Sequence, residues 1–292
     1  MKAVMLAIMM FSMGLSLTLA DFKRTAEYPE LMISGVLMQL LLLPVLAWGL
    51  ILFVGLFYSV PTIIAFGVLI LAACPGGATS NVISHLSGGD SALSVSMTAI
   101  VSLLVPFIVP FSLAYQLSWL GGDSISIQLP IIKTVLQLMV VTIIPVLMAM
   151  LLRHYWSDKI IRIEPFFRQT SGIIFILLVF SLLIIQWPKL KEMGALAAGL
   201  CLALCLLAMA TSYLIAKIQE FSPRVRKTLS IEVGIQNAGT GIFIAAVLLN
   251  NPELALIPLT YGLVMNIPAL ILIALNYSKN TATRVGQIKA EY

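Results

Sequence analysis

The sequence has little charge. Only 10% of its 292 residues are charged, whereas 60% are hydrophobic and the mean hydropathy is +1.06. A soluble domain carries about 25% charged residues, so this composition excludes a water-soluble globule. A membrane-spanning helix needs roughly 20 apolar residues and a short loop, and the length allows roughly nine or ten such spans. The composition therefore indicates an all-α polytopic membrane protein.

Sequence motifs for enzyme chemistry are also missing. The chain contains no Walker-type phosphate loop, HExxH, GxGxxG or GxSxG motif, so ATP-driven pumping and common hydrolytic or dinucleotide chemistry lack support. Cys74, Cys201 and Cys205 lie in apolar runs without a CxxC pair, so we expect no disulfide framework. The net charge of +5 could suggest a nucleic-acid partner, but basic residues of membrane proteins gather in cytoplasmic loops. We expect neither an enzyme nor a nucleic-acid-binding protein.

Apolar runs between polar or Pro/Gly breaks predict nine spans, which would place the termini on opposite sides of the lipid bilayer. Alternate loops and the C-terminal tail hold thirteen Lys and Arg residues, against three on the other side. The positive-inside rule then predicts an outer N-terminus and a cytoplasmic C-terminus. The predicted spans cover residues 3–20, 30–56, 60–87, 91–118, 128–152, 166–186, 192–216, 223–250 and 253–276.

The first span has an alternative interpretation. Lys2, an apolar run and Thr18-Leu19-Ala20 resemble a secretory signal peptide. Lys23 and Arg24 follow the run directly, and the run is longer than a usual signal core. We therefore expect a retained helix, with cleavage as the alternative.

One acidic residue lies inside a predicted span. Eleven of the twelve fall in loops, termini or helix ends, and only Glu232 remains. It follows Pro223 by nine residues, which is roughly 14 Å along a helix and near the bilayer centre. An ionised carboxylate there must be neutralised by a proton, a basic partner or a cation. Cation binding and a protonated Glu232 in a structural hydrogen bond both stay open.

Two spans contain helix-breaking sequences. Three glycines fall within residues 231–241, and each costs about 1 kcal/mol relative to alanine inside a helix. Pro75-Gly76-Gly77 interrupts the span at 60–87. Unwound backbone is tolerated in a membrane only where it is buried in protein or lines a wet cavity. Two interrupted helices, one in each half of the chain, indicate an inverted-repeat transporter with its site where the breaks cross.

Uncharged oxygen donors accompany these breaks. Ser91, Ser94, Thr98 and Ser102 share one helical face, although serines in membrane helices also serve in packing. Hard cations prefer oxygen ligands, so the residues predict a hard-cation site. The complete inventory is Gln39, Ser80, Asn81, Ser94, Thr98, Glu232, Gln236 and Asn237.

These motifs resemble the bile acid:sodium symporter family. The resemblance rests on Pro75-Gly76-Gly77 with Ser80-Asn81, on Gly89-Asp90 with residues 93–98, and on residues 232–237. It extends over essentially the whole chain, which would begin at the family's second helix. It implies a panel domain, a core domain and alternating access by movement of the core against the panel.

The same resemblance divides the chain into two repeats and a tail. Residues 1–118 would form the first repeat, with a panel span at 3–20 followed by three core spans. Residues 119–276 would form the second, with panel spans at 128–152 and 166–186 followed by three core spans. Residues 277–292 would form a cytoplasmic tail.

The resemblance also implies the residues of the site. One sodium ion would be bound by Ser80, Asn81, Ser94, Thr98 and Glu232. A second would be bound by Gln39, Glu232, Gln236 and backbone oxygens near Val233 and Ile235. Asn81 and Asn237 would face the organic anion, and Thr79 and Thr240 lie in the region where that substrate should sit.

The resulting prediction is a Na⁺-coupled secondary transporter that imports an organic anion, bile-acid-like or a smaller carboxylate, across a bacterial cytoplasmic (inner) membrane. Three alternatives stay open. Glu232 could carry a proton in place of sodium, the protein could be a membrane receptor that binds ligand without moving it, or it could export a thiol-reactive oxyanion near Cys74. No substrate identity or oligomeric state is predicted.

Overall fold

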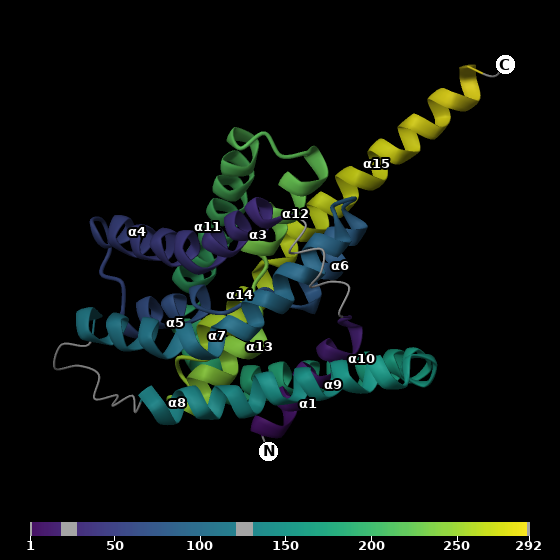
Figure 1. The fold of residues 1–292 in the computed structure, drawn as a ribbon. Helices are drawn as coiled ribbons and strands as arrows, with labels where there is room; N and C mark the ends of the chain where they lie inside the picture. Colours follow the sequence, from purple (N-terminus) through teal and green to yellow (C-terminus); the bar gives the residue numbers. More distant parts are fainter. Residues whose placement is uncertain (1, 19–27, 121–130, 291–292) are drawn as a thin grey trace.

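The structure is a computed structural model that describes residues 2–18, 28–120 and 131–290, and the chain is helical with no strand in these ranges. Figure 1 shows α1, α8, α9 and α10 together along one side of the molecule. The helices α3, α4, α11 and α12 lie on the opposite side, and α5, α7 and α13 lie between the two groups.

The first two predicted spans correspond to α1 (Lys2–Ser16) and to a continuous run of α3 (Pro29–Leu37), the π-helix η1 (Met38–Leu42) and α4 (Leu43–Gly55). Pro44 has no N–H, so the carbonyl of Leu40 loses its usual helical donor. The wider π turn lies just before this proline, and it contains Gln39. Turns of this kind often occur at functional sites.

The third predicted span is divided into α5 (Thr62–Ala72) and α6 (Ala78–Leu86), and the fourth is α7 (Ser91–Leu120). Asp90 caps the start of α7, because its Oδ1 accepts hydrogen bonds from the backbone N–H groups of Ala92 and Leu93 at 3.1 and 3.0 Å. The acidic side chain therefore has a structural partner at the helix end.

The middle of the chain forms α8 (Ile131–Leu138), the π-helix η2 (Met139–Ile143), α9 (Ile144–Tyr155), α10 (Ser157–Ile185) and α11 (Trp187–Ile218). The predicted start of the sixth span at residue 166 is wrong, because α10 begins at Ser157. Its first turns are polar in sequence, yet Ile160 is buried in a cluster with Leu15 and Ala149. This tertiary packing explains why the polar segment is helical.

The C-terminal part forms α12 (Pro223–Gly234), α13 (Ala238–Phe243), the π-helix η3 (Ile244–Leu248), α14 (Leu256–Val264) and α15 (Asn266–Ala290). The last predicted span thus contains α14 and the start of α15, which together form one candidate membrane span at Leu256–Ser278, and α15 continues into the segment predicted as a tail. Pro268 lacks the N–H that would bond to the carbonyl of Val264, which explains the interruption near Met265.

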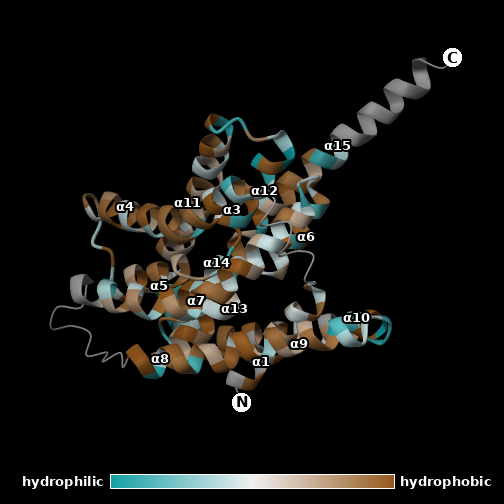
Figure 2. Cartoon of the chain, in the orientation of Figure 1, coloured by the Kyte–Doolittle hydropathy of each residue, from teal (hydrophilic) through white to brown (hydrophobic). Residues whose placement is uncertain are grey.

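Within the described ranges, six helical segments are long and apolar enough to cross a membrane. Three shorter apolar helices, Leu6–Ser16, Thr62–Ala72 and Ala238–Leu248, fall below that length. Figure 2 shows hydrophobic residues along most of the helices, and many large hydrophobic side chains, such as Leu52, Phe53 and Ile132, are exposed. The fold is therefore that of a polytopic membrane protein, while nine crossings stay a prediction.

The contacts between helices form two main groups. The helix α1 packs against η2, α9 and α10. Its approach to α9 is close, because a Cβ on Gly14 would lie 2.6 Å from the carbonyl oxygen of Val146. The helix α11 packs against α12, α14 and α4, and α14 packs against α5 and α13. The inverted repeat and the panel and core domains stay predictions.

Candidate sodium and substrate site

Both predicted helix interruptions are present, and they lie against each other. The first occupies residues 73–77 between α5 and α6, and the second occupies residues 235–237 between α12 and α13. Gly76 and Gln236 form an isolated antiparallel bridge, and the N–H of Asn237 donates to the carbonyl of Pro75 at 2.9 Å. The unwound backbone is therefore hydrogen-bonded and enclosed by protein, which is the condition under which non-helical backbone is tolerated inside a membrane.

A glycine allows Glu232 to approach the first interruption. A Cβ on Gly76 would lie 2.8 Å from Oε2 of Glu232 and 3.4 Å from Oγ of Ser80. Ser80 also closes a reciprocal cap at the start of α6, donating to the carbonyl of Gly77 at 2.7 Å and accepting from the Gly77 N–H at 3.3 Å. The carboxylate of Glu232, on α12, thus lies beside the N-terminal turn of α6.

Two hydroxyl groups one turn apart on α7 contact the carboxylate of Glu232. Ser94 Oγ donates to Oε1, and Thr98 Oγ1 donates to Oε2 at 2.9 Å. The same hydroxyls lie 2.8 and 3.1 Å from Oδ1 of Asn81, on α6. The structure therefore brings together all five residues predicted for the first sodium ion, including Ser80.

This cluster has more acceptors than donors. A hydroxyl has one hydrogen, so Ser94 and Thr98 cannot satisfy both Glu232 oxygens and Asn81 Oδ1 at once. Glu232 is 1% exposed. The ion pairs Arg153–Glu164 and Lys189–Glu253 do not involve Glu232. An excess of oxygen acceptors around an unpaired buried carboxylate fits a bound monovalent cation, or a proton on the carboxylate.

Most residues predicted for the second sodium ion form an adjoining cluster. Gln39 Nε2 donates to Gln236 Oε1 at 2.7 Å and to the carbonyl of Cys74 at 3.3 Å. Gln236 Nε2 donates to the carbonyl of Val233 at 2.7 Å. Oε1 of Gln39 is buried and has no hydrogen-bond partner among the described residues. An unpaired buried acceptor of this kind fits a cation ligand, and Ile235 lies within the same interruption.

A cavity of about 210 Å³ separates the interruptions from α1 and α10. Of the four predicted substrate residues, Thr79 and Asn237 line it. Asn81 and Thr240 are not among its lining residues, because Asn81 faces the Glu232 cluster and Thr240 is 1% exposed. The lining residues are Met9, Met10, Ser12, Met13, Ser16, Gly77, Ala78, Thr79, Ser171, Gly172, Gln236, Asn237, Ala238, Gly239 and Met265.

The far wall of this cavity was not predicted from the sequence. Met9, Met10 and Met13 of α1 and Ser171 of α10 line it, and the sequence pattern of these two helices did not mark either as a wall of the cavity. Cys74 is fully buried, donates to the carbonyl of Ile70 at 3.2 Å and does not line the cavity. The position of Cys74 therefore gives no support to the export of a thiol-reactive oxyanion.

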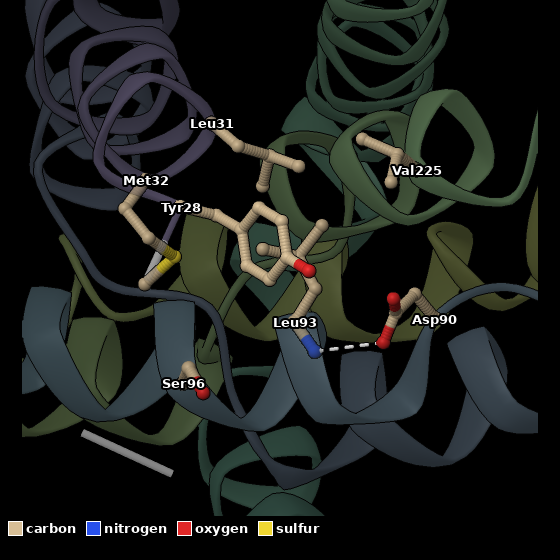
Figure 3. Close-up of a pocket in the computed structure, with 7 residues that line it drawn as sticks. All are labelled: Tyr28, Leu31, Met32, Asp90, Leu93, Ser96 and Val225. Atoms are coloured by element: carbon tan, nitrogen blue, oxygen red, sulfur yellow. Dashed lines mark hydrogen bonds between the residues drawn. The ribbon is translucent and has the colours of Figure 1, made fainter. Parts of the chain in front are cut away.

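A second cavity, of about 220 Å³, lies where α3, α7 and α12 begin (Figure 3). Its polar lining includes Asp90, whose carboxylate caps α7 as described above. Leu93 and Ser96 face this cavity, whereas Ser94 and Thr98 lie on another side of α7, where they contact Glu232. The cavity is thus separate from the Glu232 cluster.

Comparisons with known proteins place this chain in a family. The model of the Sodium Bile acid symporter family matches residues 3–193. The uncharacterized sodium-dependent transporter YocS of Bacillus subtilis is 29% identical over 243 residues, covering 83% of this chain and 72% of that protein.

Two relatives from other organisms are longer. The probable chloroplastic sodium/metabolite cotransporter BASS2 of Oryza sativa subsp. japonica is 30% identical, covering 86% of this chain and 57% of the relative. The human ileal sodium/bile acid cotransporter is 30% identical, covering 80% and 65%. The chain thus spans less than two thirds of either protein. The family and these relatives are sodium-dependent transporters and not enzymes. This integral membrane protein belongs to the Sodium Bile acid symporter family.

Proposed function

We propose that this protein is a symporter that uses a sodium gradient to import an organic anion. The observation that carries the proposal is the contact of Glu232 with the hydroxyls of Ser94 and Thr98, which themselves contact Asn81. This cluster offers one negative charge and several neutral oxygens, the ligand set that hard cations prefer. The names of the relatives, sodium/metabolite and sodium/bile acid cotransporters, agree with this use of sodium.

Two sodium ions bind in this proposal. The first is bound by Ser80, Asn81, Ser94, Thr98 and Glu232. The second is bound by Gln39, Glu232, Gln236 and the backbone oxygens of Val233 and Ile235, and the unpaired Oε1 of Gln39 supports that assignment. One carboxylate offsets one Na⁺, so the second ion leaves a surplus positive charge. An anionic substrate then binds more tightly with sodium present, and sodium with the substrate present.

The substrate occupies the cavity between the interruptions and α1. At one wall, Thr79 and Asn237 offer polar groups close to the start of α6, whose N-terminal N–H groups and dipole favour an anion. At the opposite wall, Met9, Met10 and Met13 offer flexible apolar surface. We therefore assign an amphipathic organic anion, bile-acid-like or a smaller carboxylate. Asn81 and Thr240 do not line the cavity, so in this proposal they influence the substrate only indirectly, through the first turns of α6 and α13 on which they lie.

Transport then follows alternating access. The helices α1, α8, α9 and α10 form the panel, and the remaining helices form a core that carries both interruptions. Movement of the core against the panel exposes the cavity to either side in turn. The N-terminus lies outside and the C-terminus in the cytoplasm of a bacterial cell, an orientation supported by the excess of basic residues in alternate loops.

Uptake into proteoliposomes tests this function. Radiolabelled bile acid and short carboxylates are offered either with an inward Na⁺ gradient or with an inward pH gradient in Na⁺-free buffer. Uptake that requires Na⁺ is the expected result. Uptake that ignores Na⁺ and follows the pH gradient contradicts it and assigns a proton to Glu232. Saturable binding without counterflow also contradicts it and identifies a receptor.

A further inference from the structure

The carbonyl of Gly234, the last residue of α12, accepts two hydrogen bonds from neighbouring helices. Tyr261 Oη on α14 donates to it at 2.7 Å, and Cys205 Sγ on α11 donates at 3.3 Å. A carbonyl oxygen has two lone pairs, so both acceptor positions are in use. This oxygen is therefore withheld from any cation in the adjoining interruption.

The peptide unit between Gly234 and Ile235 is held at both of its ends. Its carbonyl is bonded to Tyr261, and its N–H, which belongs to Ile235, donates to the carbonyl of Ile231 at 2.8 Å. A peptide unit is planar, so these two bonds fix its orientation. On either side of it lie the carbonyls of Val233 and Ile235, the backbone oxygens assigned above to the second sodium ion.

Packing leaves little space for this segment to move. Tyr261 is fully buried. A Cβ on Gly234 would overlap Cγ of Met209, so α11 lies directly against the end of α12. On the same helix as Tyr261, Ile257 lies against the first broken helix, where a Cβ on Gly67 would be 2.5 Å from its Cγ1. The helix α14 thus contacts both broken helices (Figure 1).

We propose that Tyr261 is a positioning residue for the second sodium site, where its hydroxyl sets the affinity for Na⁺ without contacting ion or substrate. The proposal rests on the proposed function, because it takes Val233 and Ile235 as ligands. Without the hydroxyl, the Gly234 carbonyl retains only the weak thiol donor of Cys205. The peptide unit can then turn, and the two flanking carbonyls lose their alignment.

Equilibrium binding of ²²Na⁺ to the purified full chain tests the proposal. Tyr261→Phe removes only the hydroxyl. We expect one of the two sodium-binding components to weaken roughly threefold to tenfold, the effect of losing one neutral hydrogen bond, while the other component is unchanged. Thr260→Val is the matched control, because the Thr260 hydroxyl donates within its own helix to the carbonyl of Leu256 at 2.7 Å.

Cys205 provides a second pair of variants should Tyr261→Phe fail to fold. Cys205→Ala removes the thiol donor and is expected to weaken the same component, whereas Cys205→Ser retains a donor and is expected to preserve it. A Tyr261→Phe or Cys205→Ala isotherm identical to wild type overturns the positioning role while the sodium site stands. Absence of saturable binding in the wild type itself overturns the proposed function as well.

Discussion

The side-chain amide of Gln39 donates a hydrogen bond of 2.7 Å to Oε1 of Gln236, which lies 197 positions later in the chain. The pair joins the π turn of η1 to the second interruption. It leaves Oε1 of Gln39 buried and without a partner in the described part of the structure. A buried acceptor without a donor costs free energy that a bound cation would recover.

Gln39→Leu is therefore expected to raise the Na⁺ concentration for half-maximal uptake by roughly tenfold or more, since hydrogen bonds and contacts to charged groups exceed neutral ones in strength. Uptake measured against Na⁺ concentration checks this. Gln116→Leu is the matched control, because Gln116 is also buried with an unpaired Oε1 but lies near the end of α7, far along that helix from Ser94. Equal shifts in both variants would assign the effect to packing.

Gly76→Ala is expected to abolish Na⁺-dependent uptake. Its Cβ would lie 2.8 Å from Oε2 of Glu232 and would force the carboxylate away from the first interruption. Gly49→Ala on α4 is the control, since no heavy atom lies within 4 Å of its Cβ position. Alanine favours a helix over glycine, so that variant should be as stable as wild type or more so. Normal sodium dependence in Gly76→Ala would show that the contact is not needed.

Thr228→Val is expected to lower the free energy of unfolding by about 1–3 kcal/mol. Thr228 Oγ1 lies 3.1 Å from Oγ of Ser84 and accepts from the N–H of Asp90 at 2.7 Å, so it ties α12 to α6 and to the start of α7. Thermal unfolding in detergent measures the loss. Thr211 is the control, because its hydroxyl bonds within α11, and Thr211→Val should unfold as wild type does. A Thr228→Val protein as stable as wild type would show that the Thr228 hydrogen bonds do not stabilise the fold.

Gly172→Trp is expected to block substrate uptake and to leave Na⁺ binding intact. Gly172 lines the cavity from α10, and its Cβ position has no heavy atom within 4 Å, so an indole there meets no packed neighbour at its base and is large enough to reach into the cavity. Gly194→Trp serves as the control, because Gly194 is equally open but does not line the cavity. Uptake and ²²Na⁺ binding, measured on the same variants, distinguish a loss of substrate uptake from a loss of Na⁺ binding. Unimpaired uptake by Gly172→Trp would show that the substrate does not occupy this cavity.

Local sequence was sufficient to predict the two interruptions and the polar residues that gather around Glu232. Pro75 and the glycines beside it disfavour a helix whatever surrounds them, and Glu232 stands out because membrane depth penalises a carboxylate. The start of α10 was misplaced because polarity was taken to mean a loop. There, the burial of Ile160 against Leu15 outweighs the polar neighbours.

The cavity wall and the role of α14 depend on tertiary packing. An apolar helix such as α1 has no periodic pattern that separates a lipid-facing side from a cavity-facing side, so Met9 and Met13 were not predicted to line the cavity. Thr240 lies in the second interruption by sequence, yet the turn of α13 carries it into the interior, 1% exposed. Tyr261 contacts Gly234 only through the fold, 27 positions along the chain.

The most direct test of the central claim is equilibrium binding of ²²Na⁺ to purified protein, comparing wild type with Glu232→Gln. Glutamine keeps the shape of the side chain and removes its charge, so the cluster with Ser94 and Thr98 can still form. Glu192→Gln on the exposed surface controls for loss of an acidic residue. We predict saturable binding of Na⁺ to wild type and to Glu192→Gln, and loss of that binding in Glu232→Gln. Undiminished binding in Glu232→Gln would contradict the account.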